Sequence, residues 1–203
     1  MIRLMLLLIF MMIGTSAFAD WRLPERRIVA GYFQVTGVAA NDVLNIRETP
    51  SGSSAKIGYL GYDQPIVEVL GTNPSGTWGY VQTGDTMGWT SMRYLTPTAI
   101  LTFGGTDIPV GIACYTTEPF VTYTLGNGFV KIEHMSLATS IVPILNIEKI
   151  RENYEVIYEL DGTEQRLLLS LAAKGSDGMS DIEYPWSFNA GAYYLNGGCT
   201  YMM

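Results

Sequence analysis

Apolar and polar residues alternate over much of the chain, which is the pattern of half-buried β-strands. Leu44 and Ile46 alternate with polar neighbours, and Val67 and Val69 stand on either side of Glu68. A period of two directs one set of side chains into the core and the other into solvent. Clusters of Gly, Pro, Asn and Ser break the pattern roughly every 10 residues, as in small barrels and sandwiches. The pattern therefore predicts an all-β protein.

The later part of the chain predicts two β-hairpins. Alternating apolar residues precede and follow a Gly126-Asn127-Gly128 turn within residues 121–132. They also precede and follow Asp161-Gly162 within residues 154–171. Asn-Gly and Asp-Gly favour the two-residue turns that connect antiparallel strands. Between the hairpins, one helical turn is expected over Ile144 to Arg151.

Two breaks in the strand pattern divide the chain into modules. The first pattern ends at Leu95-Thr96-Pro97-Thr98, and the Gly-rich stretch Phe103 to Asp107 precedes the next one. The expected organisation is an N-terminal linker at residues 20–30, a first β module at 31–97, a linker at 98–106 and a second β module at 107–203.

The first 19 residues have the order of a secretory signal peptide. Arg3 precedes an apolar run from Leu4 to Ile13, and small residues ending in Ala17-Phe18-Ala19 follow. A run of this length is too short for a bilayer core, which needs about 20 apolar residues. We therefore expect cleavage after Ala19 and a periplasmic or secreted protein without a permanent membrane anchor.

The charge of the chain is acidic and unevenly distributed. The formal net charge is −7, and loss of Arg3 with the signal peptide makes it −8. Residues 20–97 hold 6 basic and 7 acidic side chains, whereas residues 98–203 hold 5 and 12. An acidic surface repels nucleic-acid phosphates, so no nucleic-acid partner is expected. The second module is expected to face solvent or a basic partner.

The chain has two Cys and one His, which leaves little material for a zinc site. In an oxidising compartment the two cysteines, Cys114 and Cys199, are most simply a structural disulfide. The alternative is that Cys114 is a nucleophile with His134 as its base, and that chemistry requires a free thiolate. No metal and no cofactor are predicted.

The first module contains five characteristic sequence blocks: Val38 to Ser51, Ile57 to Leu60, Val67 to Leu70, Thr77 to Val81 and Gly88 to Leu95. In order and spacing these blocks resemble the bacterial SH3 (SH3b) family. Glu48-Thr49 stands where the family usually has small residues. The resemblance covers about 65 residues and implies a small half-open β-barrel that often binds cell-wall peptides or other envelope ligands in exported bacterial proteins.

A groove on such a barrel suits an extended peptide, because aromatic side chains offer flat contact area at low entropy cost. Trp78, Trp89 and Tyr94 are the aromatic candidates, and Asn45 and Arg47 are polar neighbours able to meet a carboxylate or a backbone amide. Trp78, Trp89, Asn45 and Arg47 also have ordinary structural roles as alternatives to ligand binding. Trp78 and Trp89 are often core in so small a module, Asn45 could fasten a turn, and Arg47 could be solvated or ion-paired.

The second module contains three distinctive segments: Cys114 to Phe120, Ser176 to Pro185 and the late Gly198-Cys199. With these segments it looks like an uncharacterised C-terminal domain of proteobacterial envelope proteins, in which no activity is known. Thr116 replaces a Gly of that family, Val121 a Trp and Gly175 a Cys. We expect this module to be a second small antiparallel barrel or sandwich.

Carboxylates in the second module form a possible second site. Glu118, Asp177 and Asp181 are the candidates, and Glu183 is a further acid able to pair with Glu118 or Asp177 across a substrate bond. Oxygens of Asp177, Ser180 and Asp181 also suit Ca²⁺, although Asp-Gly with Ser is ordinary turn chemistry.

The sequence leaves three functions open. The leading one is a non-catalytic exported protein whose SH3b-like module binds a cell-wall peptide or an envelope protein. A cell-wall hydrolase using the acids of the second module is the alternative from another class. The third is a non-catalytic envelope factor or inhibitor that covers a protein partner.

Overall fold

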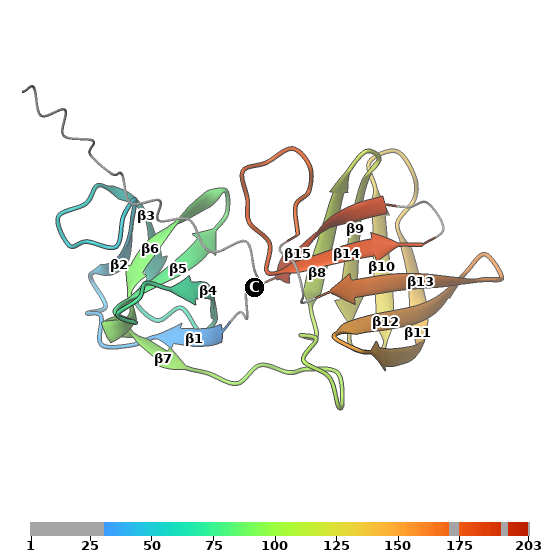
Figure 1. The fold of residues 1–203 in the computed structure, drawn as a ribbon, viewed down its shortest axis with the longest axis horizontal. Coiled ribbons are helices and arrows are strands. Elements are labelled where there is room, and N and C mark those ends of the chain that lie inside the picture. The colour runs from blue at the N-terminus through green and yellow to red at the C-terminus, as the bar shows by residue number, and fades with distance from the viewer. Residues whose placement is uncertain (1–30, 171–174, 192–194, 203) are drawn as a thin grey trace, which may run out of the picture.

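The structure, a computed structural model, describes residues 31–170, 175–191 and 195–202. It is all-β, as predicted: a seven-stranded open antiparallel sheet is followed by an eight-stranded closed antiparallel barrel (Figure 1). The expected signal peptide at 1–19 and the linker at 20–30 lie outside the described residues. Within the described residues, no helix has the length and apolar character needed to span a bilayer.

The N-terminal sheet has the strand order β3-β2-β6-β5-β4-β1-β7. Its inner face carries the buried residues Val35, Leu44, Ile46, Leu60, Val67, Val69, Val81 and Leu95. The elements are β1 (Gly31–Val35), β2 (Val43–Arg47), β3 (Lys56–Gly61), β4 (Val67–Thr72), β5 (Trp78–Thr83), β6 (Thr86–Ser91), the 3-10 helix η1 (Met92–Tyr94) and β7 (Leu95–Pro97).

Gly88 permits the close contact between β6 and β2. A Cβ atom at Gly88 would lie 2.7 Å from the Arg47 carbonyl oxygen and 2.7 Å from the Ile46 side chain. Backbone cannot move aside as the end of a flexible side chain can, so only glycine fits at this position.

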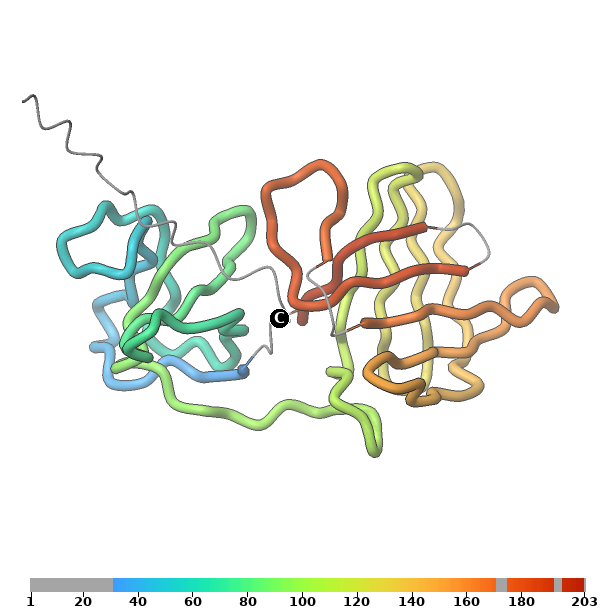
Figure 2. Tube along the Cα trace, in the orientation of Figure 1, coloured from blue at the N-terminus to red at the C-terminus, as the bar shows by residue number. Residues whose placement is uncertain are grey.

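Each barrel strand pairs with its neighbour in sequence, and the last strand, β15, pairs with the first, β8, to close the barrel (Figure 2). Closure removes every free sheet edge from this module. The strands are β8 (Ile112–Thr117), β9 (Phe120–Gly126), β10 (Phe129–His134), β11 (Ser140–Ile150), β12 (Asn153–Leu160), β13 (Thr163–Ser170), β14 (Trp186–Ala190) and β15 (Leu195–Tyr201).

Both predicted hairpins are present, as β9–β10 and β12–β13. Asp161 and Gly162 both have positive φ, 52° and 72°, as the two central residues of a type I′ turn require. The turn between β9 and β10 contains Gly128 at φ 86°. These short turns set the register that directs alternate side chains into the barrel.

The helical turn expected over Ile144 to Arg151 is wrong, because this segment belongs to the 11-residue strand β11. The register with β12 shifts between Ile144 and Asn146, which indicates a β-bulge. Ile144 and Ile147 both pack against the barrel core. One extra residue in a strand changes the inward spacing from two to three, and three is also a helical spacing. The bulge therefore accounts for the error.

The barrel interior is filled by buried side chains around Trp186, Phe188 and Tyr154. Ile108, which precedes β8, belongs to the same core and is fully buried. The Tyr154 hydroxyl donates a hydrogen bond to Asp107 Oδ2 at 2.9 Å. Residues 107 and 108 thus pack with the barrel rather than with the segment that joins the modules.

The two modules meet where β1 and β4 approach the end of β15. Glu68 Oε1 accepts a hydrogen bond from the Tyr32 hydroxyl at 2.9 Å, and Glu68 Oε2 accepts one from Thr200 and one from the backbone N–H of Tyr201. The rings of Tyr32 and Tyr201 lie edge to face, with their centroids 5.6 Å apart. The junction between the modules is therefore built around a buried carboxylate.

Candidate functional site

Four of the five residues predicted for the N-terminal groove share one face of the sheet. Arg47 on β2 lies opposite Trp89 on β6, which lies opposite Tyr80 on β5. Directly opposed residues point to the same side of a sheet. Strand alternation adds Asn45 and Trp78 to this side. We call it the outer face, because it lies opposite the face that forms the N-terminal core.

Trp89 is part of the packing of the outer face. Its side chain is only 3% exposed, and its ring centroid lies 5.1 Å from that of Tyr80. Arg47 donates a hydrogen bond from Nη1 to the carbonyl oxygen of Ser54 at 2.6 Å, so it secures the loop between β2 and β3. For Trp89, the alternative interpretation as a buried packing residue is therefore correct. Asn45 and Trp78 remain half-buried and reachable from solvent.

Tyr94 lies apart from these four residues. It sits on η1 and packs against the N-terminal core with Met92. A residue that was not predicted, Tyr59 on β3, lies directly opposite Asn45 and is 64% exposed. The sequence held the signal for Tyr59, because alternation with the apolar Leu60 places Tyr59 on the solvent side.

Asp177 anchors its own loop. Oδ1 accepts hydrogen bonds from the backbone N–H groups of Met179 at 3.0 Å and Ser180 at 2.9 Å. Oδ2 accepts bonds from the Ser180 hydroxyl at 2.6 Å and the Tyr184 hydroxyl at 3.1 Å. Burial alone would raise the pKa of Asp177, but these hydrogen bonds together lower it. These hydrogen bonds are those of an ordinary turn, which was the alternative interpretation to a Ca²⁺ site.

The other acidic candidates do not join Asp177 in a metal-type cluster. Glu118 and Asp181 are both exposed. Among the residues that the structure describes, no group of three or more His, Cys, Asp or Glu side chains is arranged to hold a metal ion. The loop that carries Asp177 is tied to the barrel by Thr117, whose hydroxyl donates to the Asp177 carbonyl oxygen at 2.5 Å.

Cys114 and Cys199 form a disulfide, as predicted, with the sulfurs 2.06 Å apart. They lie directly opposite each other on β8 and β15, fully buried in the barrel. A bonded sulfur is not a thiolate, so Cys114 is not a nucleophile in this form. Disulfides are typical of oxidising, extracytoplasmic compartments.

Gly175 lies against neighbouring backbone. A Cβ atom at Gly175 would lie 2.1 Å from the Trp186 carbonyl oxygen and 2.4 Å from the Gly198 Cα. Gly175 also pairs with Tyr184 as an isolated bridge. Backbone fills the place of any side chain there, so only glycine fits at this position.

A cavity of about 470 Å³ opens at the end of the barrel where β9 begins and β10 ends. We call it the barrel-mouth cavity. Four of its lining residues, Tyr123, Ile132, Tyr158 and Leu195, are buried. Its other lining residues are Pro119, His134, Leu137, Ala138, Ser140, Leu160, Asp161 and Gln165.

The lining of the barrel-mouth cavity follows from the strand pattern. Tyr123 points inward from the centre of β9, and Tyr158 and Ile132 point inward near the ends of β12 and β10. An eight-stranded barrel has an interior that side chains fill or that holds one small ligand. This barrel is packed around its disulfide and hollow at its mouth. Small-molecule sites are concave, largely apolar and of this size.

His134 belongs to the barrel-mouth cavity and not to a catalytic pair with Cys114. It is half-buried at the end of β10. The sequence placed His134 at a strand end but gave no sign of the cavity. The lining residues come from segments far apart in the chain, and only closure of the barrel brings them together.

No protein family, curated protein or solved structure that was compared with the chain matches it. The resemblances of the two modules therefore remain interpretations of their motifs. What the fold and the disulfide establish is an all-β protein with an open antiparallel sheet and a disulfide-bonded, closed eight-stranded barrel.

Proposed function

We propose that the chain is a periplasmic or secreted binding protein without catalytic activity, and that the barrel-mouth cavity holds its ligand. The observation that carries the proposal is a cavity of about 470 Å³ with apolar and aromatic walls inside a closed barrel. The signal-peptide pattern of residues 1–19 and the disulfide support an extracytoplasmic location.

The arrangement of the acidic residues supports binding rather than hydrolysis. Both oxygens of the Asp177 carboxylate accept hydrogen bonds from its own loop, which suits a fixed structural group better than a proton donor. An acid or base catalyst usually has a pKa shifted toward neutrality, and that of Asp177 is shifted the other way.

Binding of the neutral fluorescent probe N-phenyl-1-naphthylamine to the mature chain tests this function. We expect a saturable rise in fluorescence with one site per chain. Ala138→Trp should abolish it, because Ala138 lines the mouth and indole would fill the opening. Thr139→Trp is the matched control, since Thr139 is an exposed neighbour outside the lining. Equal probe binding by both variants would refute the proposal.

A second candidate function is recognition of a cell-wall or envelope peptide by the outer face of the N-terminal sheet. Asn45 and Trp78 are accessible on this face, and Tyr59 adds a largely exposed ring opposite Asn45. Aromatic and amide side chains in a row suit an extended peptide. This candidate agrees with the SH3b resemblance and requires a site separate from the barrel-mouth cavity.

A further inference from the structure

We propose that the ligand of the barrel-mouth cavity is a cationic amphiphile, an apolar chain that carries a protonated amine, because an apolar cavity opens here at an acidic rim. This inference rests on the proposed function, since it names the class of molecule for the same cavity.

The interior of the cavity accepts only an apolar part of the ligand. Tyr123, Ile132, Tyr158 and Leu195 are each less than 9% exposed, and their side chains form its deeper walls. A charged group placed among them would lose its hydration without gaining a counter-ion. The charged end of an amphiphile must therefore stay at the rim.

The rim supplies a carboxylate for such a charged end. Asp161 lines the cavity and lies exposed in the turn between β12 and β13. In the part of the chain that the structure describes, Asp161 has no ion-pair partner. Leu160 lies beside it in the same lining, so apolar and anionic surfaces meet at this point.

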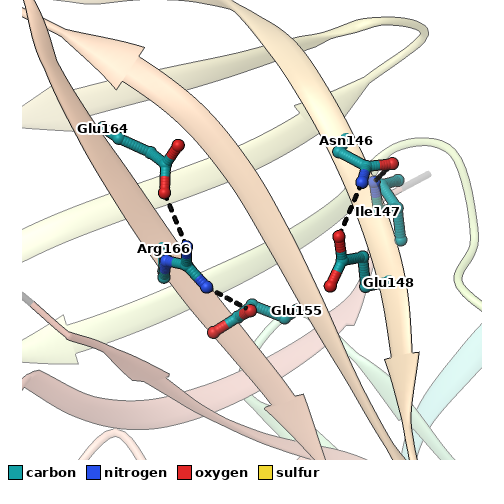
Figure 3. Close-up of polar contacts among 6 residues, drawn as sticks. All are labelled: Asn146, Ile147, Glu148, Glu155, Glu164 and Arg166. Atoms are coloured by element: carbon teal, nitrogen blue, oxygen red, sulfur yellow. Dashed lines mark hydrogen bonds and ion pairs between the residues drawn. The ribbon is translucent and has the colours of Figure 1, made fainter.

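The basic side chains near this end of the barrel are already paired with acids. Arg166 bonds to Glu155 at 2.7 Å and to Glu164 at 2.6 Å (Figure 3). Lys131 bonds to Glu133 at 2.7 Å. Two further acids near the mouth, Glu118 and Glu159, are exposed.

The field at the mouth is therefore negative, which attracts cations and repels anions. His134 adds a ring that can donate or accept a hydrogen bond to the head group. A fatty acid would match the apolar walls but would bring its carboxylate to an acidic rim.

Three C12 probes of equal chain length test the charge preference. Dodecylammonium, dodecanol and dodecanoate are titrated into the mature chain in a calorimeter at pH 7 and low salt, each at concentrations at which it is dissolved as a monomer. We expect dodecylammonium to bind about fivefold more tightly than dodecanoate, with the alcohol between them, since an exposed ion pair has a modest effect. Higher salt should reduce the difference in affinity between dodecylammonium and dodecanoate.

Asp161→Asn should remove most of the preference for dodecylammonium over dodecanoate. Asn tolerates the positive φ of 52° at this turn position, so the variant should fold. Glu152→Gln is the control, because it removes one charge from an exposed residue at the opposite end of the barrel.

The outcomes separate the inference from the proposed function. If dodecanoate binds as tightly as dodecylammonium, or if the preference for dodecylammonium survives Asp161→Asn, the proposal of a cationic ligand is wrong. The cavity would then still bind apolar chains. If none of the three probes binds, and N-phenyl-1-naphthylamine also fails to bind, the proposed function itself is wrong.

Discussion

Glu68 accepts a hydrogen bond from the hydroxyl of Thr200, so a single carboxylate of the N-terminal sheet holds the last strand of the barrel. Glu68 is buried, and burial raises its pKa from 4.5 to about 6, although the hydrogen bonds from Thr200, Tyr32 and the Tyr201 backbone act to lower it. The same burial and the neighbouring Glu68 charge raise the pKa of Tyr32, which stays protonated as a donor.

This shift predicts a pH dependence of stability. The folded state holds a proton on Glu68 more tightly than the unfolded state does. Protonated Glu68 therefore stabilises the fold below about pH 4.5, and this stabilisation is lost as the pH rises through 6. The loss is about 2 kcal/mol for a shift of this size. Urea unfolding of the native chain and of Glu68→Gln between pH 4.5 and 7.5 measures it. A stability difference between them that does not change with pH would contradict the assignment.

The disulfide should make a large contribution to stability. Cys114 and Cys199 are 85 positions apart, and closing a loop of that length stabilises by roughly 4 to 5 kcal/mol in the chain-entropy account. We expect the melting temperature of the mature chain to be lower by roughly 10 to 20 °C after the disulfide has been reduced under denaturing conditions. Migration on gels with and without reductant verifies the bond, and an unchanged melting temperature would show that the bridge is dispensable.

The two outer-face tryptophans should respond differently to truncation. Trp89→Ala should destabilise the N-terminal module by about 3 to 5 kcal/mol, because Trp89 is 3% exposed. Trp78→Ala should cost less, because Trp78 is half-buried. Chemical unfolding monitored by circular dichroism compares the two variants. Equal losses would show that Trp78 is as much a core residue as Trp89.

Sedimentation of the mature chain with purified peptidoglycan at low salt tests the peptide candidate. Tyr59→Ala should reduce the sedimented fraction without changing stability, since Tyr59 is 64% exposed. Tyr62→Ala is a control of the same chemistry, with a ring that is 40% exposed and lies beyond the end of β3. No sedimentation of the unmodified chain, or the same effect from both variants, would exclude this face as the site.

Asp177 should stabilise its loop only while ionised. Asp177→Ala removes the acceptor of four hydrogen bonds, and we expect the loop of residues 176–185 to exchange its amides faster and to be cleaved more readily by proteases. Asp181→Ala, at an exposed position nearby, should change neither. Because the pKa of Asp177 is lowered in the fold, its contribution is lost as the pH falls through that depressed pKa.

Local chemistry explains which parts of the fold were predictable. Asp161-Gly162 specifies its turn through two positive φ values, so the hairpin could be predicted from neighbouring residues. Ile144 and Ile147 misled the helical interpretation, because a bulge is a property of the pairing between β11 and β12. The alternation of apolar and polar residues predicted that Tyr123 points inward, but it could not predict that Tyr123 lines a cavity.

The candidate site depended on contacts over long sequence distances. Leu195 and Pro119 line one cavity only because β15 returns to pair with β8. Trp89 is buried between Tyr80, which lies on the preceding strand β5, and Arg47, which lies on the distant strand β2. Residue type alone cannot distinguish such a tryptophan from one that offers a binding surface.

The covalent bond between the first and last barrel strands has a consequence for resistance to proteolysis. Cys114 and Cys199 enclose nearly the whole barrel sequence between them. A protease that cuts any one connecting loop within that span leaves the two pieces joined, and the intact strand pairs can hold them in place. A nicked molecule should therefore migrate as a single species until its bridge is reduced, and its barrel can stay closed when the backbone is broken once.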